Sequence, residues 1–204
     1  MRGLTLGIIL LAMTALPAIA QISKQVEVQV GSAQDKAITA IQSAPNSRQK
    51  LALLNKFAAA YPTGDMALMA DNLYVSVYSS LRDYPKAYAF GNRALVLDPN
   101  DLNVAVALIR DAQLQSDTAR MVSYGVRVGQ MVARYKAQPA PAGMSASEWA
   151  QEEKQNLAVV QPQIQWVISS VYAAISAEQP SSAKTSMLNQ MAKAFPGSSH
   201  GKQE

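Results

Sequence analysis

The sequence predicts an all-α fold with no sheet, and three observations support this prediction. Apolar residues recur at helical spacing along almost all of residues 33–196. Short segments rich in Pro, Gly, Asn and Asp interrupt this spacing at intervals of about one helix. Residues 53–62 and 187–196 share an apolar pair, Asn, a large apolar residue, Ala, and a final Ala-aromatic-Pro. Two segments that end a helix in the same way indicate a repeated helix pair.

The composition allows a packed core and argues against one class of partner. Of the 204 residues, 49% are hydrophobic and 16% are charged, which is enough apolar surface for one folded domain. The net charge of +4 comes from scattered Lys and Arg, whereas nucleic-acid binders gather basic residues on one face. We therefore expect no nucleic-acid partner. The chain has no cysteine, so it has no disulfide and cannot carry the lipid of a bacterial lipoprotein.

Residues 1–20 have the pattern of a signal peptide. Arg2 supplies the positive charge, and an uncharged apolar run extends from Gly3 to Leu16. Pro17 and the small residues Ala18 and Ala20 then form a cleavage site. We expect cleavage after Ala20, a periplasmic or secreted protein, and no membrane insertion afterwards. The alternative is an uncleaved membrane anchor, since the apolar run is nearly long enough to span a bilayer.

The first elements of the mature chain are a lead-in and two helices. Residues 21–32 are expected to be a flexible lead-in, although residues 26–30 alternate as a short strand does. The first helix is expected over about residues 33–42, with three apolar side chains turned inward, Ala37, Ile38 and Ile41. Ser47 is expected to cap a second helix that ends near Tyr61. Its buried stripe would consist of Leu51, Leu54, Phe57 and Ala58.

The third and fourth helices have recognisable starts. Asp65 is a suitable cap for a third helix of about residues 66–81. Asp83 is expected to cap the fourth helix, which carries Pro85 in its first turn. Proline is tolerated there because the first N–H groups of a helix have no partner within the helix. The fourth helix should end before Asp98, and a proline turn follows it.

The fifth helix is expected over about residues 102–114. A cap at Ser116 or Asp117 should start a sixth helix that ends near residue 136. Two glycines lie four residues apart on one face of that helix, Gly125 and Gly129. Because glycine has no Cβ, this face is expected to be approached closely by a neighbouring helix.

The C-terminal part begins after the one evident linker, residues 137–145, which contains two prolines and a glycine. Residues 146–196 are expected to form helices that complete the array, the first of them capped by Ser145 or Ser147. Pro162 interrupts the helical pattern, so either a kink or a new helix start is expected there. The last pair of helices would span residues 163–177 and 181–195, and residues 197–204 would form a disordered tail.

The middle of the chain carries a period of 34 residues. A step of 34 residues from Tyr78, Ala87 and Ala94 leads to the apolar residues Ala112, Met121 and Val128. This period, the small residues and the proline turn resemble the tetratricopeptide repeat. The match is good over residues 68–101, partial over residues 102–133, and limited to the general pattern elsewhere.

On the family's pattern, Tyr78 lies near the end of a first helix, Tyr84 follows the turn, and Pro99 closes the unit. The chain departs from that pattern at three positions, Asp71, Val75 and Gly91. The resemblance implies helix–turn–helix repeats over residues 33–136, stacked as a short right-handed α-solenoid. The alternative is an irregular helical bundle with the same apolar stripes.

The chain lacks the residues of a recognisable catalytic or metal site. The only histidine is His200, near the end of the polar tail, whereas a metal site or a Ser-His-Asp arrangement needs a histidine held in place. Asp98 and Asp101 flank a turn and are interpreted as helix caps. Trp149 and Trp166 are expected to pack against neighbouring helices. We therefore expect no metal, no cofactor and no enzymatic activity.

The resemblance implies that a protein or peptide partner binds to the concave face, which the first helix of each pair would line. On that pattern, the candidate contact residues are Asn72, Ser76, Ser79, Asn103, Arg110 and Gln113. The expected function is an exported scaffold that binds a partner. Two alternatives stay open: a structural envelope module that self-associates through its apolar helices, and an enzyme.

Overall fold

The computed structural model describes residues 22–24 and 26–198, and this part of the chain is all-helical, with eight α-helices and no strand. The predicted signal peptide and residues 199–204 of the predicted tail, with His200, lie outside the described residues. In the described part, no helix combines the length and the apolar character needed to cross a membrane.

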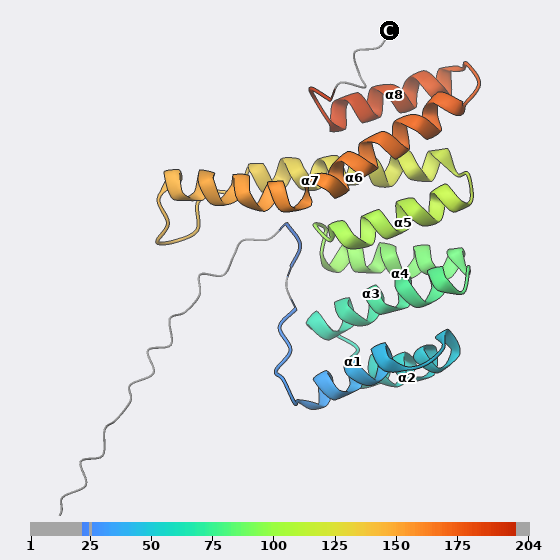
Figure 1. Cartoon of the computed structure of the whole chain (residues 1–204), viewed down its shortest axis with the longest axis vertical. Helices are drawn as coiled ribbons and strands as arrows, with labels where there is room; N and C mark the ends of the chain where they lie inside the picture. Colours follow the sequence, from blue (N-terminus) through green and yellow to red (C-terminus); the bar gives the residue numbers. More distant parts are fainter. Residues whose placement is uncertain (1–21, 25, 199–204) are drawn as a thin grey trace, which may run out of the picture.

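The helices follow one another in a stack (Figure 1), with bounds α1 (Ala33–Ser43), α2 (Ser47–Ala60), α3 (Gly64–Ser80), α4 (Tyr84–Leu97), α5 (Leu102–Leu114), α6 (Thr118–Lys136), α7 (Ala146–Ala177) and α8 (Ser182–Ala194). Each helix packs on the next in the chain, and α6 also packs on α8. Two further contacts skip one helix: α3 touches α5, and α5 touches α7. Alternate helices therefore lie next to each other in the middle of the molecule.

Most helices begin where a polar side chain can accept a hydrogen bond from the first turn. Asp83, Asp101, Asp117 and Ser145 all do so, as the sequence predicts. Ser145 and Glu148 form a reciprocal capping box. Local chemistry of this kind depends on neighbours three residues away, which is why the sequence predicts these starts well.

Two predicted N-caps are wrong. Asn46, not Ser47, caps α2, because its side chain accepts from the N–H of Gln49. Asp65 does not cap α3, which starts one residue earlier after Thr63; instead it pairs with Lys24. Asp98 is the C-cap residue of α4, where its backbone N–H donates to Ala94, and its carboxylate accepts from the N–H groups of Asn100 and Lys24.

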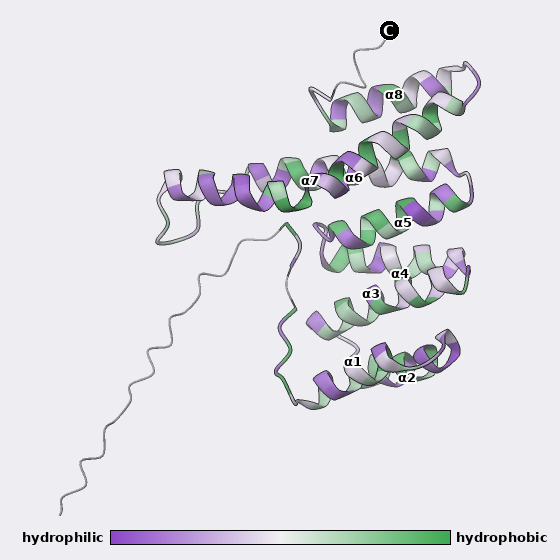
Figure 2. Cartoon of the chain, viewed as in Figure 1, coloured by the Kyte–Doolittle hydropathy of each residue, from purple (hydrophilic) through white to green (hydrophobic). Residues whose placement is uncertain are grey.

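Pro162 does not separate two helices. α7 runs unbroken for 32 residues with Pro162 inside it, so the separate helix predicted over residues 163–177 is wrong. Figure 1 shows α7 changing direction along its length, as expected where a proline ring displaces the preceding turn. The first part of α7 is largely hydrophilic and the second part largely hydrophobic (Figure 2), so the second part is the one suited to burial.

The core consists of two clusters of buried side chains. The small cluster joins α1, α2, α3 and α4 and contains Ile38, Ile41, Leu54, Phe57, Ala70, Tyr74, Val77, Tyr78 and Ala87. The large cluster extends from α3 to α8 and includes Ala94, Leu108, Val128, Val171 and Met191. Helices α3 and α4 contribute to both clusters, and the partly buried Phe90 packs against both.

The glycines of α6 allow the close helix approach that the sequence predicts. A Cβ on Gly129 would lie 2.5 Å from the carbonyl oxygen of Ala194 in α8. A Cβ on Gly125 would lie 3.1 Å from the sulfur of Met191. On α4, a Cβ on Gly91 would lie 2.7 Å from the Leu108 side chain, so α5 packs closely against α4 at this position.

The segment 22–24 differs from the flexible lead-in that the sequence predicts. Ile22 is buried in the large cluster with 5% of its surface exposed. The N–H of Lys24 donates to Asp98 over 2.9 Å. The Ser23 hydroxyl donates to one backbone group of the α4–α5 turn and accepts from another, those of Asn100 and Leu102. The segment is therefore docked against the middle of the stack.

Candidate functional site

A hollow of about 380 Å³ lies between α3 and α5, and we call it the α3–α5 groove. Its lining consists of Asn72, Val75, Ser76, Ser79, Asn103, Val104, Ala107, Arg110 and Asp111. Five of the six predicted contact residues are in this set, although they come from helices about 30 residues apart in the chain. The contact between α3 and α5 brings them together.

Gln113 is the exception. It is exposed on α5 but does not line the groove. The groove stripe on α5 runs through Asn103, Ala107 and Arg110, and helical spacing continues it to Leu114. Gln113 projects roughly a quarter turn away from that stripe. Leu114, with 72% of its surface exposed, lies on the continuation of that stripe.

Two of the groove's polar residues are held by buried carboxylates. The Asn72 amide donates to Asp101 over 2.7 Å, and the Ser79 hydroxyl donates to Asp111 over 2.5 Å. Burial raises the pKa of both carboxyl groups, and these hydrogen bonds partly offset that rise. Asn72 and Ser79 therefore also support the packing of α3 on α5. The Asn72 side-chain oxygen is buried and has no hydrogen-bond partner.

Arg110 forms no ion pair with its neighbours Asp111 and Asp117. Asp111 accepts from Ser79, and Asp117 pairs with Arg120. The Arg110 guanidinium instead lies 5.0 Å from the ring centre of Trp166 on α7. A cation over an aromatic face is held in place while its N–H donors stay accessible.

Helix α7 lies beside the α5 side of the groove, although none of its residues line the groove. Trp166 is half-buried and packs against the large cluster, as predicted, and it also lies beside Arg110. The Gln163 amide also lies near Asn103, with 3.4 Å between the two side-chain atoms. The proximity of α5 and α7 is a tertiary contact with no local sequence signal. The 34-residue period, which implies that alternate helices are neighbours, was the one sequence feature that pointed to this contact.

The groove can donate and accept hydrogen bonds, and Arg110 can bind a carboxylate. Asn103 offers an amide with two donors and one acceptor, and Ser76 an exposed hydroxyl. These groups suit recognition of a polypeptide backbone. In the described part of the chain, no group of three or more His, Cys, Asp or Glu side chains is arranged to hold a metal ion.

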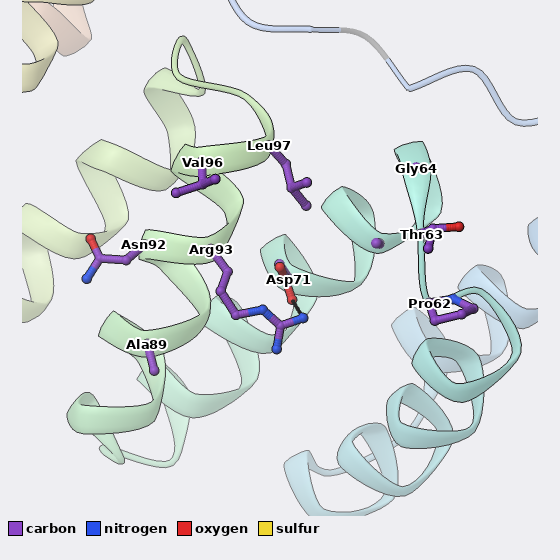
Figure 3. A pocket seen from close by; sticks show the side chains of 10 residues that line it. Pro62, Thr63, Gly64, Asp71, Ala89, Asn92, Arg93, Val96 and Leu97 are labelled. Carbon is purple, nitrogen blue, oxygen red and sulfur yellow. Dashed lines mark ion pairs between the residues drawn. The ribbon is translucent and has the colours of Figure 1, made fainter.

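A second hollow, which the sequence analysis did not predict, lies between α3, α4 and the turn before α3 (Figure 3). We call it the α3–α4 hollow, and its volume is about 500 Å³. Its polar residues include Asp71 and Arg93, whose atoms approach to 3.2 Å. Burial raises the pKa of Asp71, and the Arg93 charge partly offsets that rise. The sequence shows that Asp71 departs from the repeat pattern, but it does not show that Asp71 pairs with Arg93, 22 residues later.

No family model, curated protein or solved structure matches this chain.

Proposed function

We propose that the protein is an exported helical-repeat scaffold that binds a protein or peptide partner in the α3–α5 groove. The main support is that five predicted contact residues line one hollow. Among them, Arg110 lies over Trp166 and stays accessible to a ligand. A partner segment would contribute backbone amides to Asn103 and Ser76, and a carboxylate or carbonyl to Arg110.

We propose that the helices form a short right-handed solenoid of tetratricopeptide type. In support, residues 34 apart occupy equivalent environments: Tyr78, Ala87 and Ala94 are all buried, and so are Ala112, Met121 and Val128. The contacts of α3 with α5 and of α5 with α7 also support it, because in such a solenoid the first helices of successive pairs are neighbours.

We also propose that residues 1–20 are removed during export, which would place the scaffold in the periplasm or outside the cell. The support is the charged start, the apolar run and the small residues before Gln21. The intact mass of protein recovered from a periplasmic fraction should correspond to a chain that begins at Gln21. A mass that retains Met1 would contradict this part of the proposal.

A self-assembling envelope module is the second candidate function. Leu114 and Val159 favour it, because both are large apolar side chains left mostly exposed, at 72% and 78%. The two functions differ in solution behaviour. A groove binder should keep the mass of a monomer as its concentration rises, whereas a self-assembling module should show a mass that increases.

The groove is tested by capture of cross-linked envelope partners with the parent and Arg110→Ala as bait. Arg110→Ala should reduce recovery of the specific partner severalfold, because it removes the accessible cation of the groove. Its helicity should match that of the parent, and its free energy of unfolding from urea titration should stay within about 0.5 kcal/mol, since the side chain is exposed.

Arg127→Ala is the matched control. Arg127 is also an exposed arginine beside an aromatic ring, 6.0 Å from the centre of Tyr124, but it lies on α6 outside the groove. Recovery with Arg127→Ala should equal that of the parent. Equal recovery with all three baits would rule out the α3–α5 groove as the binding surface and favour self-assembly.

A further inference from the structure

The α3–α4 hollow has the size and walls of a small-molecule site. Its volume of about 500 Å³ lies within the usual range of such sites, roughly 300–1,000 Å³. Its apolar wall includes Pro62, Ala67, Ala89, Val96 and Leu97. No residue lines both this hollow and the α3–α5 groove.

The last turn of α4 leaves apolar surface open at this hollow. Val96 is 77% exposed and Leu97 is 48% exposed. They are two of the six large hydrophobic side chains exposed in the described part of the chain, and they are adjacent in sequence. Single exposed apolar residues are ordinary, but two together on the wall of a hollow provide a surface that a ligand can cover.

The accessible charge of the hollow is positive. Arg93 extends from α4 to Asp71 on α3 (Figure 3), where its Nη2 atom lies 3.2 Å from Oδ1 of Asp71. Asp71 is only 1% exposed, and its Oδ2 atom has no hydrogen-bond partner. The Arg93 side chain is 64% exposed. A guanidinium has five N–H donors, so most of those on Arg93 stay free for a ligand.

The burial of Asp71 decides the sign of the ligand's charge. A ligand amine could reach the Asp71 carboxylate only by displacing Arg93, whereas a ligand anion can bind the exposed side of Arg93 without moving it. No other residue that lines the hollow carries a charge. The Asn92 and Thr63 side chains add neutral polar groups to the rim.

We propose that the α3–α4 hollow binds a small molecule with one carboxylate on an aliphatic body. The carboxylate pairs with Arg93, and the aliphatic body covers Val96, Leu97 and Ala89. A planar guanidinium suits a carboxylate because two parallel N–H groups can contact its two oxygens. Burial of each further methylene should tighten binding roughly fourfold until the hollow is filled.

The test is calorimetric titration of the full purified chain with sodium octanoate, and with octylamine as the comparison of opposite charge. Octanoate should bind, and octylamine should bind at least about tenfold more weakly. Asp71→Asn should tighten octanoate binding severalfold, because it removes the internal anion that competes for Arg93. Tighter binding of octylamine than of octanoate would overturn the proposal, as would no binding of octanoate.

Two charge variants at Val96 test the location without touching the core. Val96→Asp and Val96→Lys remove the same exposed side chain and add opposite charges. Octanoate should bind at least about tenfold more weakly to Val96→Asp than to Val96→Lys. Val159→Asp and Val159→Lys, at a position on α7 that is 78% exposed, are the matched controls and should bind equally.

Equal octanoate affinity in the two Val96 variants would overturn the assignment of the carboxylate to this hollow. Arg110→Ala separates this proposal from the proposed groove, since it should leave octanoate binding unchanged. Loss of octanoate binding in Arg110→Ala would move the ligand to the groove and overturn the inference, whatever the outcome of partner capture.

Discussion

The small and large clusters bring their helices together in different ways. In the small cluster, the rings of Tyr74, Tyr78 and Phe90 are stacked, with centres 4.1–5.9 Å apart. In the large cluster, Gly129 of α6 lies directly against the backbone of Ala194 in α8, and Gly125 lies against the Met191 side chain. Aromatic rings fill the space between helices, whereas glycine removes it.

The difference predicts opposite sensitivities to mutation. A contact filled by rings should be weakened mainly by removing atoms, because the loss leaves a cavity. A contact made against backbone should be weakened by adding a single methyl group, because backbone cannot move aside. The comparison can therefore be tested with substitutions that change only one or a few atoms.

The largest effect is expected from Gly129→Ala. The new Cβ would lie 2.5 Å from the carbonyl oxygen of Ala194, so α8 would have to shift. We expect a loss of about 3 kcal/mol in the free energy of unfolding, at the upper end of overpacking effects. Urea unfolding followed by circular dichroism measures the loss.

Gly125→Ala, one turn earlier on α6, is the control. Its nearest obstacle is the flexible end of Met191 at 3.1 Å, which can move aside. Alanine also favours the helix by up to about 1 kcal/mol over glycine. The midpoint should therefore change little. Equal losses in the two variants would show that contact with backbone is not what distinguishes this interface.

Intermediate effects are expected from Ala87→Leu and Ala94→Leu. Both alanines are fully buried on α4, Ala87 in the small cluster and Ala94 in the large one. Each leucine should overpack its site and lower stability by about 1–3 kcal/mol. Ala173→Leu, at an exposed position of α7, should stay within about 0.5 kcal/mol.

The shape of these unfolding curves tests how separate the clusters are. Helices α3 and α4 belong to both, so we expect one transition in each variant. Two transitions in Ala87→Leu would show that the small cluster unfolds independently. An unchanged urea midpoint in either variant would contradict the close-packing role that the 34-residue period predicts for that alanine.

The smallest effect is expected from Asp111→Asn. Burial raises the pKa of Asp111 above its ordinary value of 3.8, so keeping the carboxylate ionised lowers stability at neutral pH. The amide should retain the Ser79 hydrogen bond, and we expect a gain below about 1 kcal/mol at pH 7.

The stability difference between Asp111→Asn and the parent should depend on pH. As the pH falls through the raised folded-state pKa towards 3.8, the carboxyl group of the parent takes up a proton and its penalty disappears. The stability advantage of Asp111→Asn should therefore shrink on acidification. Urea midpoints of both proteins between pH 7 and pH 4 measure it, and an advantage that grows would contradict the burial of an ionised Asp111.

The sequence predicts the helices well because their ends depend on local chemistry. Asp83, Asp101 and Asp117 each bond to an N–H three residues ahead, a contact visible in the chain itself. The sequence did not reveal the docking of segment 22–24, because its partners are 74–79 residues away. The unbroken course of α7 through Pro162 was also undecidable from local pattern.

The candidate site was predicted in part for the same reason. The resemblance to the repeat pattern selected the five groove residues on α3 and α5, and it could do so because the face of a helix is a local property. Trp166 and the pairing of Asp71 with Arg93 depend on how helices pack, so no spacing rule could have found them. Gln113 lies outside the groove because it is off the stripe on its own helix.

The docked segment 22–24 has a consequence for the order of folding. Contacts between consecutive helices join residues close in the chain and should form quickly. Ile22 and Ser23 can dock only after α4 and α5 have come together, so we expect their docking to be a late step. Once docked, they close a loop that contains α1 to α4. Terminal helices of a stack usually fray first, and here α1 is held both by α2 and by the chain that precedes it.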